Sequence, residues 1–279
     1  MIVQAISSKR GVLMGTIYAV ANQKGGVGKS TTVVNLAAYL GSVGKKVLCI
    51  DLDAQGNTTT SFGIKKKTLT ATTYDVLIGQ RRIQDAMIET AFDGVTVVPA
   101  TSSLVGGDID LVEFEDRARR LHSQLLTCKL GFDYIFIDCP PSLSLLTLNG
   151  FVAADYVIVP MKCEPLSLEG LAQLWETVRH VKQRYNPKLD IKGVLFTMYD
   201  PRLNLTTHIV NEVKKHFPNR VFETTIPRNV RLSEAPSLGK PVMYYDPGSK
   251  GTEAYEMLGR ELLGDKAPPL TSKKKKFGR

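Results

Sequence analysis

Long apolar runs, paired cysteines and an excess of charge in the body of the chain are all missing from this sequence of 279 residues. No run of about 18 apolar residues occurs, so no membrane-spanning helix is predicted. The N-terminal stretch MIVQAISSKR lacks an apolar segment as long as a secretory signal needs. The four cysteines show no CxxC spacing, and we interpret them as buried free thiols of a reducing cytosol rather than as metal or cluster ligands.

The formal charge of +9 is concentrated at the two ends of the chain. Residues 266–279 carry six positive charges and no acid, and residues 1–15 carry two positive charges and no acid, which leaves +1 for residues 16–265. This distribution excludes a globally basic nucleic-acid coat but allows a local basic patch. Hydrophobic residues make up 43% of the chain, which is too many for a disordered protein.

Apolar strand-like runs alternate with helical patterns along the chain, which predicts an α/β fold with a doubly wound, mostly parallel sheet flanked by helices. We expect strands at 16–22, 46–52, 95–99, 133–138, 156–160, 191–197 and 221–226, and helices at 30–40, 108–128, 168–185, 203–217 and 252–263. No internal repeat or Pro/Gly/Ser linker divides the body. We therefore predict one domain over residues 14–264, between an N-terminal extension (1–13) and a basic, disordered tail (265–279).

The strongest local signal is the glycine-rich loop NQKGGVGKST at 22–31, between the first strand and the first helix. Its first glycine is displaced from the GxxxxGK[ST] pattern, because Lys24 and Gly25 occupy the start of the loop. The glycines let backbone N–H groups surround a phosphate, and the helix N-terminus adds partial positive charge. Lys29 is expected to reach the β- and γ-phosphates, and the Ser30 hydroxyl to bind Mg²⁺. The predicted phosphate-binding residues are Gly25, Gly26, Val27, Gly28, Lys29, Ser30 and Thr31.

Two strand ends supply the acids that phosphate chemistry needs. Asp51 and Asp53 close the run KVLCIDLD, and Asp138 closes DYIFID. Because the carboxyl ends of parallel strands face one crevice, these acids should lie beside the glycine-rich loop. Asp138 has the features of a Walker B residue that holds Mg²⁺ through water. Asp53 is placed to orient the attacking water and is a second candidate for the metal.

Together these segments resemble the ParA/Soj family of chromosome- and plasmid-partitioning ATPases, deviant Walker A proteins of the MinD/ParA superfamily. The matching segments are KGGVGKST, DLDAQGNTT, DYIFIDCPPSL, CEPLSLEGL and TTIPRNVRLSEAPSLGKPV, and they span about residues 14–263. Ala54 departs from the family, which usually has proline there. The resemblance implies a P-loop NTPase architecture for residues 14–264 and a cytoplasmic, nucleoid-associated protein of a bacterium.

The resemblance also implies a mechanism. ATP and Mg²⁺ would bring two copies together into a homodimer with the nucleotide between them, and Lys24 would reach across to the phosphates of the other copy. The implied catalytic residues are Lys24, Lys29 and Asp53, with weak basal ATP hydrolysis that a ParB-type centromere-binding protein stimulates. The expected base-binding residues are Thr197, Met198, Pro227, Asn229 and Val230. Met198 replaces the lysine of guanine-reading motifs, which favours adenine, although Asp200 keeps GTP open.

Non-specific binding of double-stranded DNA by the ATP-bound dimer is a further implication. Arg202 and Arg231 match positions where the family places DNA-contacting arginines, and Lys240 and Lys250 complete the candidate set. Residues 186–251 contain ten Lys and Arg against six Asp and Glu. The four lysines at 273–276 fit an additional DNA contact and a solvated tail equally well.

The predicted function is therefore an ATP-dependent DNA-partitioning switch that drives chromosome or plasmid segregation. One alternative is a related ATPase that positions a protein cargo. A MinD-like membrane-associated ATPase is a second, although the tail has no apolar face that would insert into a bilayer. An ATP-dependent ligase or synthetase is a third, although no added cluster of His, Cys or acids suggests a site for a second substrate.

Overall fold

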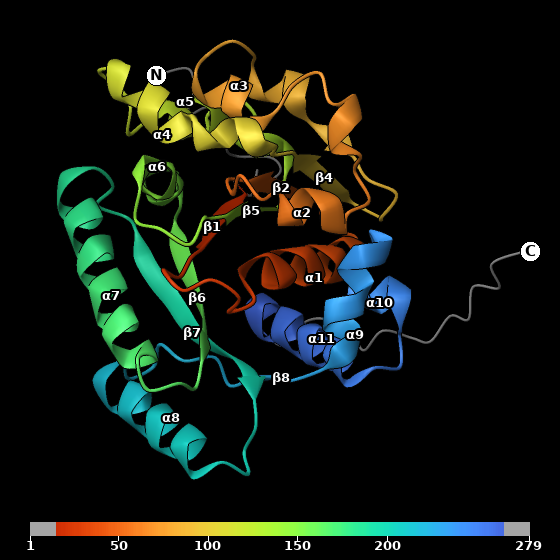
Figure 1. Ribbon diagram of the computed structural model, residues 1–279, viewed down its shortest axis with the longest axis vertical. Coiled ribbons are helices and arrows are strands. Elements are labelled where there is room, and N and C mark those ends of the chain that lie inside the picture. The colour runs from red at the N-terminus through yellow and green to blue at the C-terminus, as the bar shows by residue number, and fades with distance from the viewer. Residues whose placement is uncertain (1–14, 265–279) are drawn as a thin grey trace, which may run out of the picture.

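The computed structural model describes residues 15–264 (Figure 1). The predicted N-terminal extension and the predicted basic tail lie outside the described residues. Within that range, no helix is both long and apolar enough to cross a membrane.

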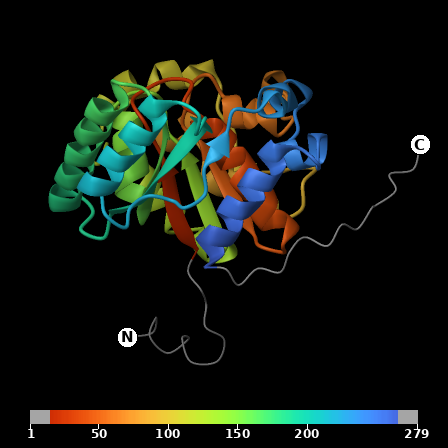
Figure 2. The ribbon, with the colours of Figure 1, turned by 90° about the horizontal axis from the view of Figure 1, so that it is seen from below.

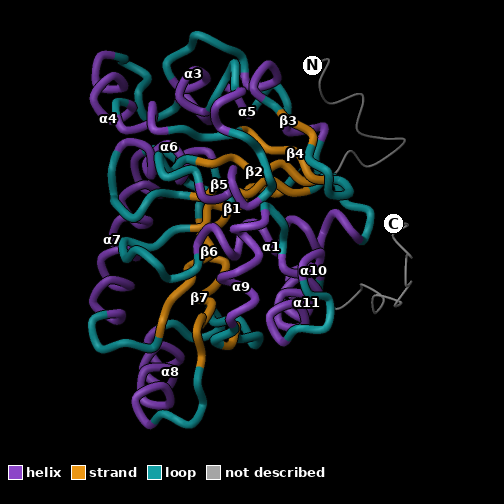
Figure 3. The backbone as a smooth tube through the Cα atoms, turned by 45° about the vertical axis from the view of Figure 1, so that its right-hand side comes forward, coloured by secondary structure: helices purple, strands orange, loops and turns teal. Residues whose placement is uncertain are grey.

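One sheet of eight strands runs through the molecule in the order β3-β4-β2-β5-β1-β6-β7-β8, and Figure 3 shows it as a continuous, twisted layer. The strands are β1 (Thr16–Val20), β2 (Val47–Asp51), β3 (Ile88–Glu89), β4 (Val95–Val98), β5 (Tyr134–Asp138), β6 (Tyr156–Lys162), β7 (Asp190–Tyr199) and β8 (Ile226–Pro227). Neighbouring strands are parallel, except that β3 and β4 are antiparallel. The predicted α/β class with a mostly parallel sheet is confirmed.

Helices cover both faces of this sheet. They are α1 (Lys29–Ser42), α2 (Asn57–Ser61), α3 (Thr73–Leu77), α4 (Gly107–Asp110), α5 (Arg120–Leu125), α6 (Leu145–Ala153), α7 (Ser167–Arg184), α8 (Asn204–His216), α9 (Val230–Glu234), α10 (Val242–Tyr245) and α11 (Lys250–Leu263). Figure 2 shows α7 and α8 on one side of the strands and α1 with α11 on the other. Because the helices cover the faces of the sheet, loops lie at the carboxyl ends of the central strands.

The alternation of side chains along each strand creates two hydrophobic cores. On β1, Ile17 and Ala19 belong to the core beneath α6 and α7, whereas Tyr18 and Val20 belong to the core beneath α1 and α11. Because the strands are buried on both faces, they read as continuous apolar runs in the sequence. The two cores hold β1, β2 and β5 together, and the predicted phosphate-binding residues and acids lie at or just after the carboxyl ends of these strands.

The predicted helix at 108–128 is wrong. The structure has α4, a 3₁₀ turn over Leu111–Glu113 and then α5, with non-helical backbone between them. Asn149 of α6 explains the break, since its side chain donates to the Arg117 carbonyl oxygen (2.7 Å) and accepts from the Leu121 N–H (3.2 Å). A distant amide thus takes backbone groups that a continuous helix would pair within itself.

The predicted strand at 221–226 is also wrong. An isolated bridge joins Val221 to Val194, and the strand β8 is confined to Ile226–Pro227. The carboxylate of Glu261 accepts from the backbone N–H groups of Glu223 (2.7 Å) and Thr224 (2.9 Å), so these donors are not available to a ladder.

Candidate nucleotide-binding site

The glycine-rich loop lies between the end of β1 and the start of α1, as the sequence predicts. Two neighbouring strands hold it. The Thr197 hydroxyl of β7 donates to the Val27 carbonyl oxygen (2.8 Å), and the Asn22 amide donates to the Pro160 carbonyl oxygen of β6 (2.8 Å). Gly26 and Gly28 adopt left-handed backbone with φ values of +65° and +91°. Glycine has no Cβ to oppose this conformation, so the loop can take a tight anion-binding shape.

Two adjoining hollows surround the start of α1. The larger has a volume of about 570 Å³ and is lined by Gly25, Gly26, Gly28, Lys29, Ser30, Thr31, Asp53, Gln55, Asn57, Thr60, Ser61, Pro141, Pro236 and Ser237. The smaller, of about 190 Å³, is lined by Gly28, Thr31, Thr197, Met198, Ile226, Pro227, Arg228, Asn229, Leu232, Ser233 and Tyr255. We call these the phosphate-side cleft and the base-side hollow. Gly28 and Thr31 line both, so the predicted phosphate and base residues occupy neighbouring compartments.

Two predicted binding residues are placed differently from the others. Val27 lines neither compartment and is buried, with its carbonyl oxygen bound to the Thr197 hydroxyl. Val230 turns its side chain outward and is 69% exposed. Val27 therefore acts through its backbone, and Val230 does not line the base-side hollow.

Lys29 is the buried cation of the phosphate-side cleft. Its side chain is placed by the first turn of α1 and the residue is only 6% exposed. The ammonium donates to the Lys24 carbonyl oxygen (3.2 Å), which uses one of its three N–H donors. Burial lowers the pKa of Lys29, and the nearby carboxylates of Asp138 and Asp53 oppose that shift. A buried ammonium with spare donors is suited to binding an anion such as phosphate.

Asp51 and Asp138 form a buried pair of carboxylates behind the cleft. They are partners in the β2–β5 register and are both fully buried. Asp51 accepts from the Thr59 N–H (2.8 Å) and hydroxyl (2.7 Å), and Asp138 accepts from the Thr58 hydroxyl (2.8 Å). Burial and the charge of Asp51 raise the pKa of Asp138 to about 7, and burial raises the pKa of Asp51 to about 6. The two groups are too close and too dry for both to ionise easily.

One oxygen of this pair fits the predicted metal site. Asp138 Oδ1 is buried and has no hydrogen-bond partner, and the Ser30 hydroxyl lies near enough to the same carboxylate to oppose the rise of its pKa. A buried carboxylate oxygen without a partner costs free energy unless a ligand or water satisfies it. Ser30 and Asp138 are therefore suited to a hydrated Mg²⁺ whose remaining ligands are phosphate oxygens and water.

Asp53 lies in the wall of the phosphate-side cleft, on a tight turn between β2 and α2. Its carboxylate accepts from the Gln55 N–H (2.9 Å), and its carbonyl oxygen accepts from the Gly56 N–H (2.8 Å). The hydroxyls of Thr58 and Thr59 anchor α2 to the buried pair behind it. The turn thus holds an almost buried carboxylate beside Lys29 and the phosphate loop.

Lys24 points elsewhere. Its ammonium lies 3.7 Å from the Glu164 carboxylate, on the loop after β6, and its side chain does not line the phosphate-side cleft. Its backbone N–H donates to the Asn22 side chain (3.0 Å), which fixes the loop at this point. Within one chain, Lys24 is therefore not directed at the anion that Lys29 would bind.

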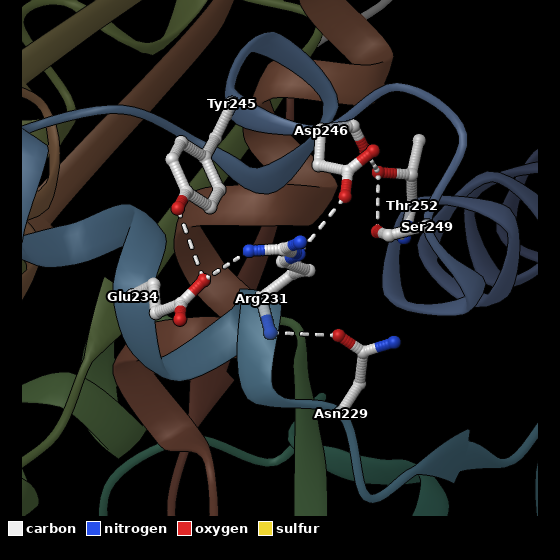
Figure 4. A network of polar contacts seen from close by, with 7 residues as sticks. All are labelled: Asn229, Arg231, Glu234, Tyr245, Asp246, Ser249 and Thr252. Carbon is white, nitrogen blue, oxygen red and sulfur yellow. Dashed lines mark hydrogen bonds and ion pairs between the residues drawn. The ribbon is translucent and has the colours of Figure 1, made fainter.

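The two arginines predicted to contact DNA are both ion-paired. Arg202, on the loop between β7 and α8, makes a two-bond contact with Asp200 at 2.6 and 2.9 Å, although its side chain is 86% exposed. Hydrogen bonds from Arg202 lower the pKa of Asp200 to about 2. Arg231 pairs with Glu234 at 2.7 Å and Asp246 at 3.1 Å (Figure 4).

The two predicted lysines lie on the same C-terminal segment as Arg231. Lys250 is exposed at the start of α11, and Lys240 is exposed on the segment between α9 and α10. Arg202 comes from a different part of the fold, at the end of β7. Three of the four predicted DNA-contacting residues thus belong to one segment, 231–250.

Sequence reasoning missed several residues of the site. Leu232, Ser233 and Tyr255 line the base-side hollow, and Thr58 and Thr59 hold the buried carboxylates. The run of hydroxyl residues TTTS at 58–61 was a readable signal for the second group, because buried carboxylates need donors. Tyr255 reaches the base-side hollow because α11 packs against α1, and the sequence around Tyr255 does not indicate this position.

Comparisons with known proteins give a consistent set of relatives. A family model described as an AAA domain matches residues 15–191. The chain is 48% identical over 255 residues to chromosome partitioning protein ParA of Myxococcus xanthus (91% of this chain, 90% of that protein). It is 50% identical over 252 residues to sporulation initiation inhibitor protein Soj of Bacillus subtilis (90% and 100%). A crystal structure of cobyrinic acid a,c-diamide synthase from Mycobacterium smegmatis with bound ADP and magnesium superposes with a TM-score of 0.78 at 37% identity, covering 90% of this chain and 94% of that one.

Proposed function

The chain belongs to the ParA/Soj family of chromosome-partitioning ATPases, and from this premise we propose that it is an ATP-dependent DNA-partitioning switch. In this proposal the ATP-bound homodimer binds double-stranded DNA without sequence preference, and hydrolysis, stimulated by a ParB-type centromere-binding protein, releases it. Residues 14–264 are the ATPase domain, and the protein acts on the bacterial nucleoid. The observation that carries the proposal is the meeting of the glycine-rich loop and the buried Lys29 at the phosphate-side cleft, with the unpartnered oxygen of Asp138 buried behind it.

The nucleotide part of the proposal rests on the charges around the cleft. Lys29 and the backbone of the glycine-rich loop bind the phosphates, and the base-side hollow takes the adenine. Ser30 and Asp138 hold Mg²⁺, which when bound neutralises charge on the phosphate oxygens. Asp53 accepts a hydrogen bond from the attacking water, since its carboxylate lines the same cleft as Lys29.

The proposed dimer gives Lys24 a role that its position in one chain does not provide. Its ammonium makes a weak contact with the Glu164 carboxylate at 3.7 Å. The ammonium of Lys162 lies 3.9 Å from the same carboxylate. A half-exposed ion pair of this length contributes little free energy, so a phosphate of the other copy can displace it. A second cation near the transferred phosphoryl group would stabilise its developing charge.

The likeness to a synthase does not favour a small-molecule substrate here. Such an enzyme needs room for a second substrate next to the nucleotide. Three further hollows in the described residues, of about 410, 650 and 420 Å³, share no lining residue with the phosphate-side cleft or the base-side hollow. A DNA surface or a protein partner fits the exposed cations of residues 231–250 better.

The experiment that tests the proposal measures binding of a random-sequence DNA duplex without nucleotide, with ADP and with ATP, at two salt concentrations. We expect binding with ATP and Mg²⁺ that weakens as salt rises, because phosphate contacts release counterions. Lys29→Ala is the control, since it should remove the nucleotide response while leaving the surface cations in place. Binding that ignores nucleotide would overturn the switch, and no binding at all would redirect the search to a membrane or a second small-molecule substrate.

A further inference from the structure

Arg231 is surrounded by more negative than positive charge. Its Nη1 atom lies 2.7 Å from Glu234 Oε2, and its Nε atom lies 3.1 Å from Asp246 Oδ2 (Figure 4). One guanidinium and two carboxylates give this cluster a net charge of −1. Because a DNA phosphate is also negative, the cluster as it stands repels the ligand that Arg231 is proposed to bind.

Groups other than Arg231 hold the Glu234 carboxylate and the backbone of Asp246 in place. The Tyr245 hydroxyl donates to Glu234 Oε2 (3.0 Å), and the Thr252 hydroxyl donates to the Asp246 carbonyl oxygen (2.7 Å). Glu234 comes from α9, whereas Asp246 comes from the turn between α10 and α11. The pair formed by Arg231 and Asp246 therefore joins α9 to the α10–α11 turn.

We propose that Glu234 and Asp246 form a carboxylate clamp that keeps Arg231 from binding DNA phosphate until nucleotide occupies the neighbouring hollow. This inference rests on the proposed function, because it concerns the regulation of the same DNA-contacting residue. In the clamped arrangement Arg231 satisfies its charge within the chain. Release of both Asp246 and Glu234 leaves the guanidinium free to bind a phosphate.

The link to nucleotide lies in α9 itself. Leu232 and Ser233 line the base-side hollow, and they stand between Arg231 and Glu234 in the sequence. Leu232 also packs closely on α11, since a Cβ at Gly251 would lie 2.8 Å from Leu232 Cγ. A nucleotide that contacts Leu232 and Ser233 therefore acts on the same five-residue helix that carries the clamp. The nucleotide favours release of Arg231 if it binds more tightly to the position of α9 in which the two ion pairs are broken than to the position in which they are formed.

The ion pair at Arg202 has a different construction. Arg202 and Asp200 lie two residues apart on one loop, and one cation faces one carboxylate, so the pair is neutral. It does not bridge two elements of the fold. Nucleotide control through ion pairs is therefore assigned to Arg231 and not to Arg202.

The test compares the wild-type chain with the double variant Glu234→Gln, Asp246→Asn. Both changes keep a hydrogen-bond acceptor of similar shape and remove the charge. We expect DNA affinity without nucleotide to rise about tenfold. The two carboxylates no longer compete with DNA phosphate for Arg231, and two exposed ion pairs together lower that affinity by up to about tenfold. The affinity with ATP should rise much less, so the ratio of the two affinities falls.

A matched control separates the clamp from net charge. The double variant Asp85→Asn, Glu176→Gln changes the net charge equally and also frees two arginines, since Asp85 pairs with Arg82 and Glu176 with Arg179. It should leave the ratio of ATP-bound to nucleotide-free DNA affinity unchanged. Adding Arg231→Ala to the clamp variant should remove the gain in affinity. ATP affinity, measured on each protein, checks that the fold is intact.

Three outcomes decide the matter. If the wild type binds DNA with ATP and the clamp variant keeps the wild-type ratio, the clamp is wrong and the proposed function stands. If the charge control changes the ratio as much as the clamp variant does, net charge explains the effect and the clamp is again wrong. If the wild type binds no DNA with ATP, the proposed function fails and the clamp fails with it. The single variants Glu234→Gln and Asp246→Asn, each expected to give part of the gain, replace the double variant if it does not fold.

Discussion

The phosphate-side cleft and the segment 231–250 both carry cations suited to phosphate, but they hold these cations in opposite ways. Lys29 is buried, has a lowered pKa and lies behind a glycine-rich loop, near a carboxylate oxygen that has no partner. Arg231 is about half exposed and already contacts two carboxylates. The first region is therefore completed by its ligand, whereas the second must lose an internal contact before it binds one. This difference suits a switch in which nucleotide binds first and DNA second.

The largest expected effect comes from removing the buried cation. Lys29→Ala should weaken ATP binding on the order of 100-fold, because the charged hydrogen bonds to the phosphates are lost from a dry site. Isothermal titration with ATP and Mg²⁺ measures this directly. The control is Lys67→Ala, which removes an exposed lysine that lines neither compartment of the site. Wild-type ATP affinity in Lys29→Ala would contradict the assignment of the phosphate loop.

The next effect concerns hydrolysis without loss of binding. Asp53→Ala should lower the rate of phosphate release roughly 100-fold or more, since a carboxylate that positions a water typically contributes that much. ATP affinity should change little, and the variant should stay on DNA in the presence of ATP. A stopped assay of phosphate release, run beside a DNA-binding assay, measures both. Unaltered turnover would remove Asp53 from the catalytic residues.

A smaller effect is expected at the exposed cation. Arg231→Glu should weaken DNA binding of the ATP-bound protein roughly tenfold and reduce the salt dependence by about one counterion, as expected for one lost phosphate contact. ATP-driven dimerisation should persist, because Val230 and Arg231 do not line the base-side hollow. Gel shifts over a salt series and sedimentation with ATP report the two properties. Wild-type DNA binding would place the DNA surface elsewhere.

The same contrast explains which features could be predicted from the sequence. The loop at 22–31 and the strand-end acids are local patterns, and parallel strands bring their carboxyl ends together whatever the helices do. The clamp on Arg231 depends on Asp246, which is distant in sequence and arrives through the packing of α10 and α11. Nothing near Arg231 in the sequence signals that contact.

The two wrong elements have the same kind of cause. The charged pattern at 108–128 suits a helix, but Asn149 of another helix takes its backbone groups. The apolar run at 221–226 suits a strand, but the Glu261 carboxylate takes its N–H donors. In both cases a single polar side chain from a distant element overrides local propensity, and a single sequence does not reveal such a contact.

The smallest expected effect is on the pH dependence of stability, and it sharpens the contrast between buried and exposed charge. Burial raises the pKa values of Asp51 and Asp138 to about 6 and about 7, and the charge of Asp51 adds to the rise at Asp138, whereas both groups titrate near 4 when the chain is unfolded. Between those values the folded protein binds more protons than the unfolded chain. The free energy of unfolding of the protein free of metal and nucleotide should therefore fall as pH rises from 5.5 to 8, by on the order of 1 kcal/mol.

Glu234 of the exposed clamp should contribute nothing over that pH range, because hydrogen bonds from Arg231 and Tyr245 lower its pKa. Urea unfolding in EDTA at pH 5.5 and pH 8 measures the slope. Asp138→Asn should flatten it, whereas Glu234→Gln should leave it as in the wild type. His122, whose pKa is lowered by burial, acts in the opposite direction and is present in all three proteins, so it cancels in the comparison. If the free energy of unfolding of Asp138→Asn depended on pH as strongly as that of the wild type, the extra protons of the folded state would not be bound by the buried pair. The pair behind the cleft would then not supply the negative charge that a bound cation would neutralise.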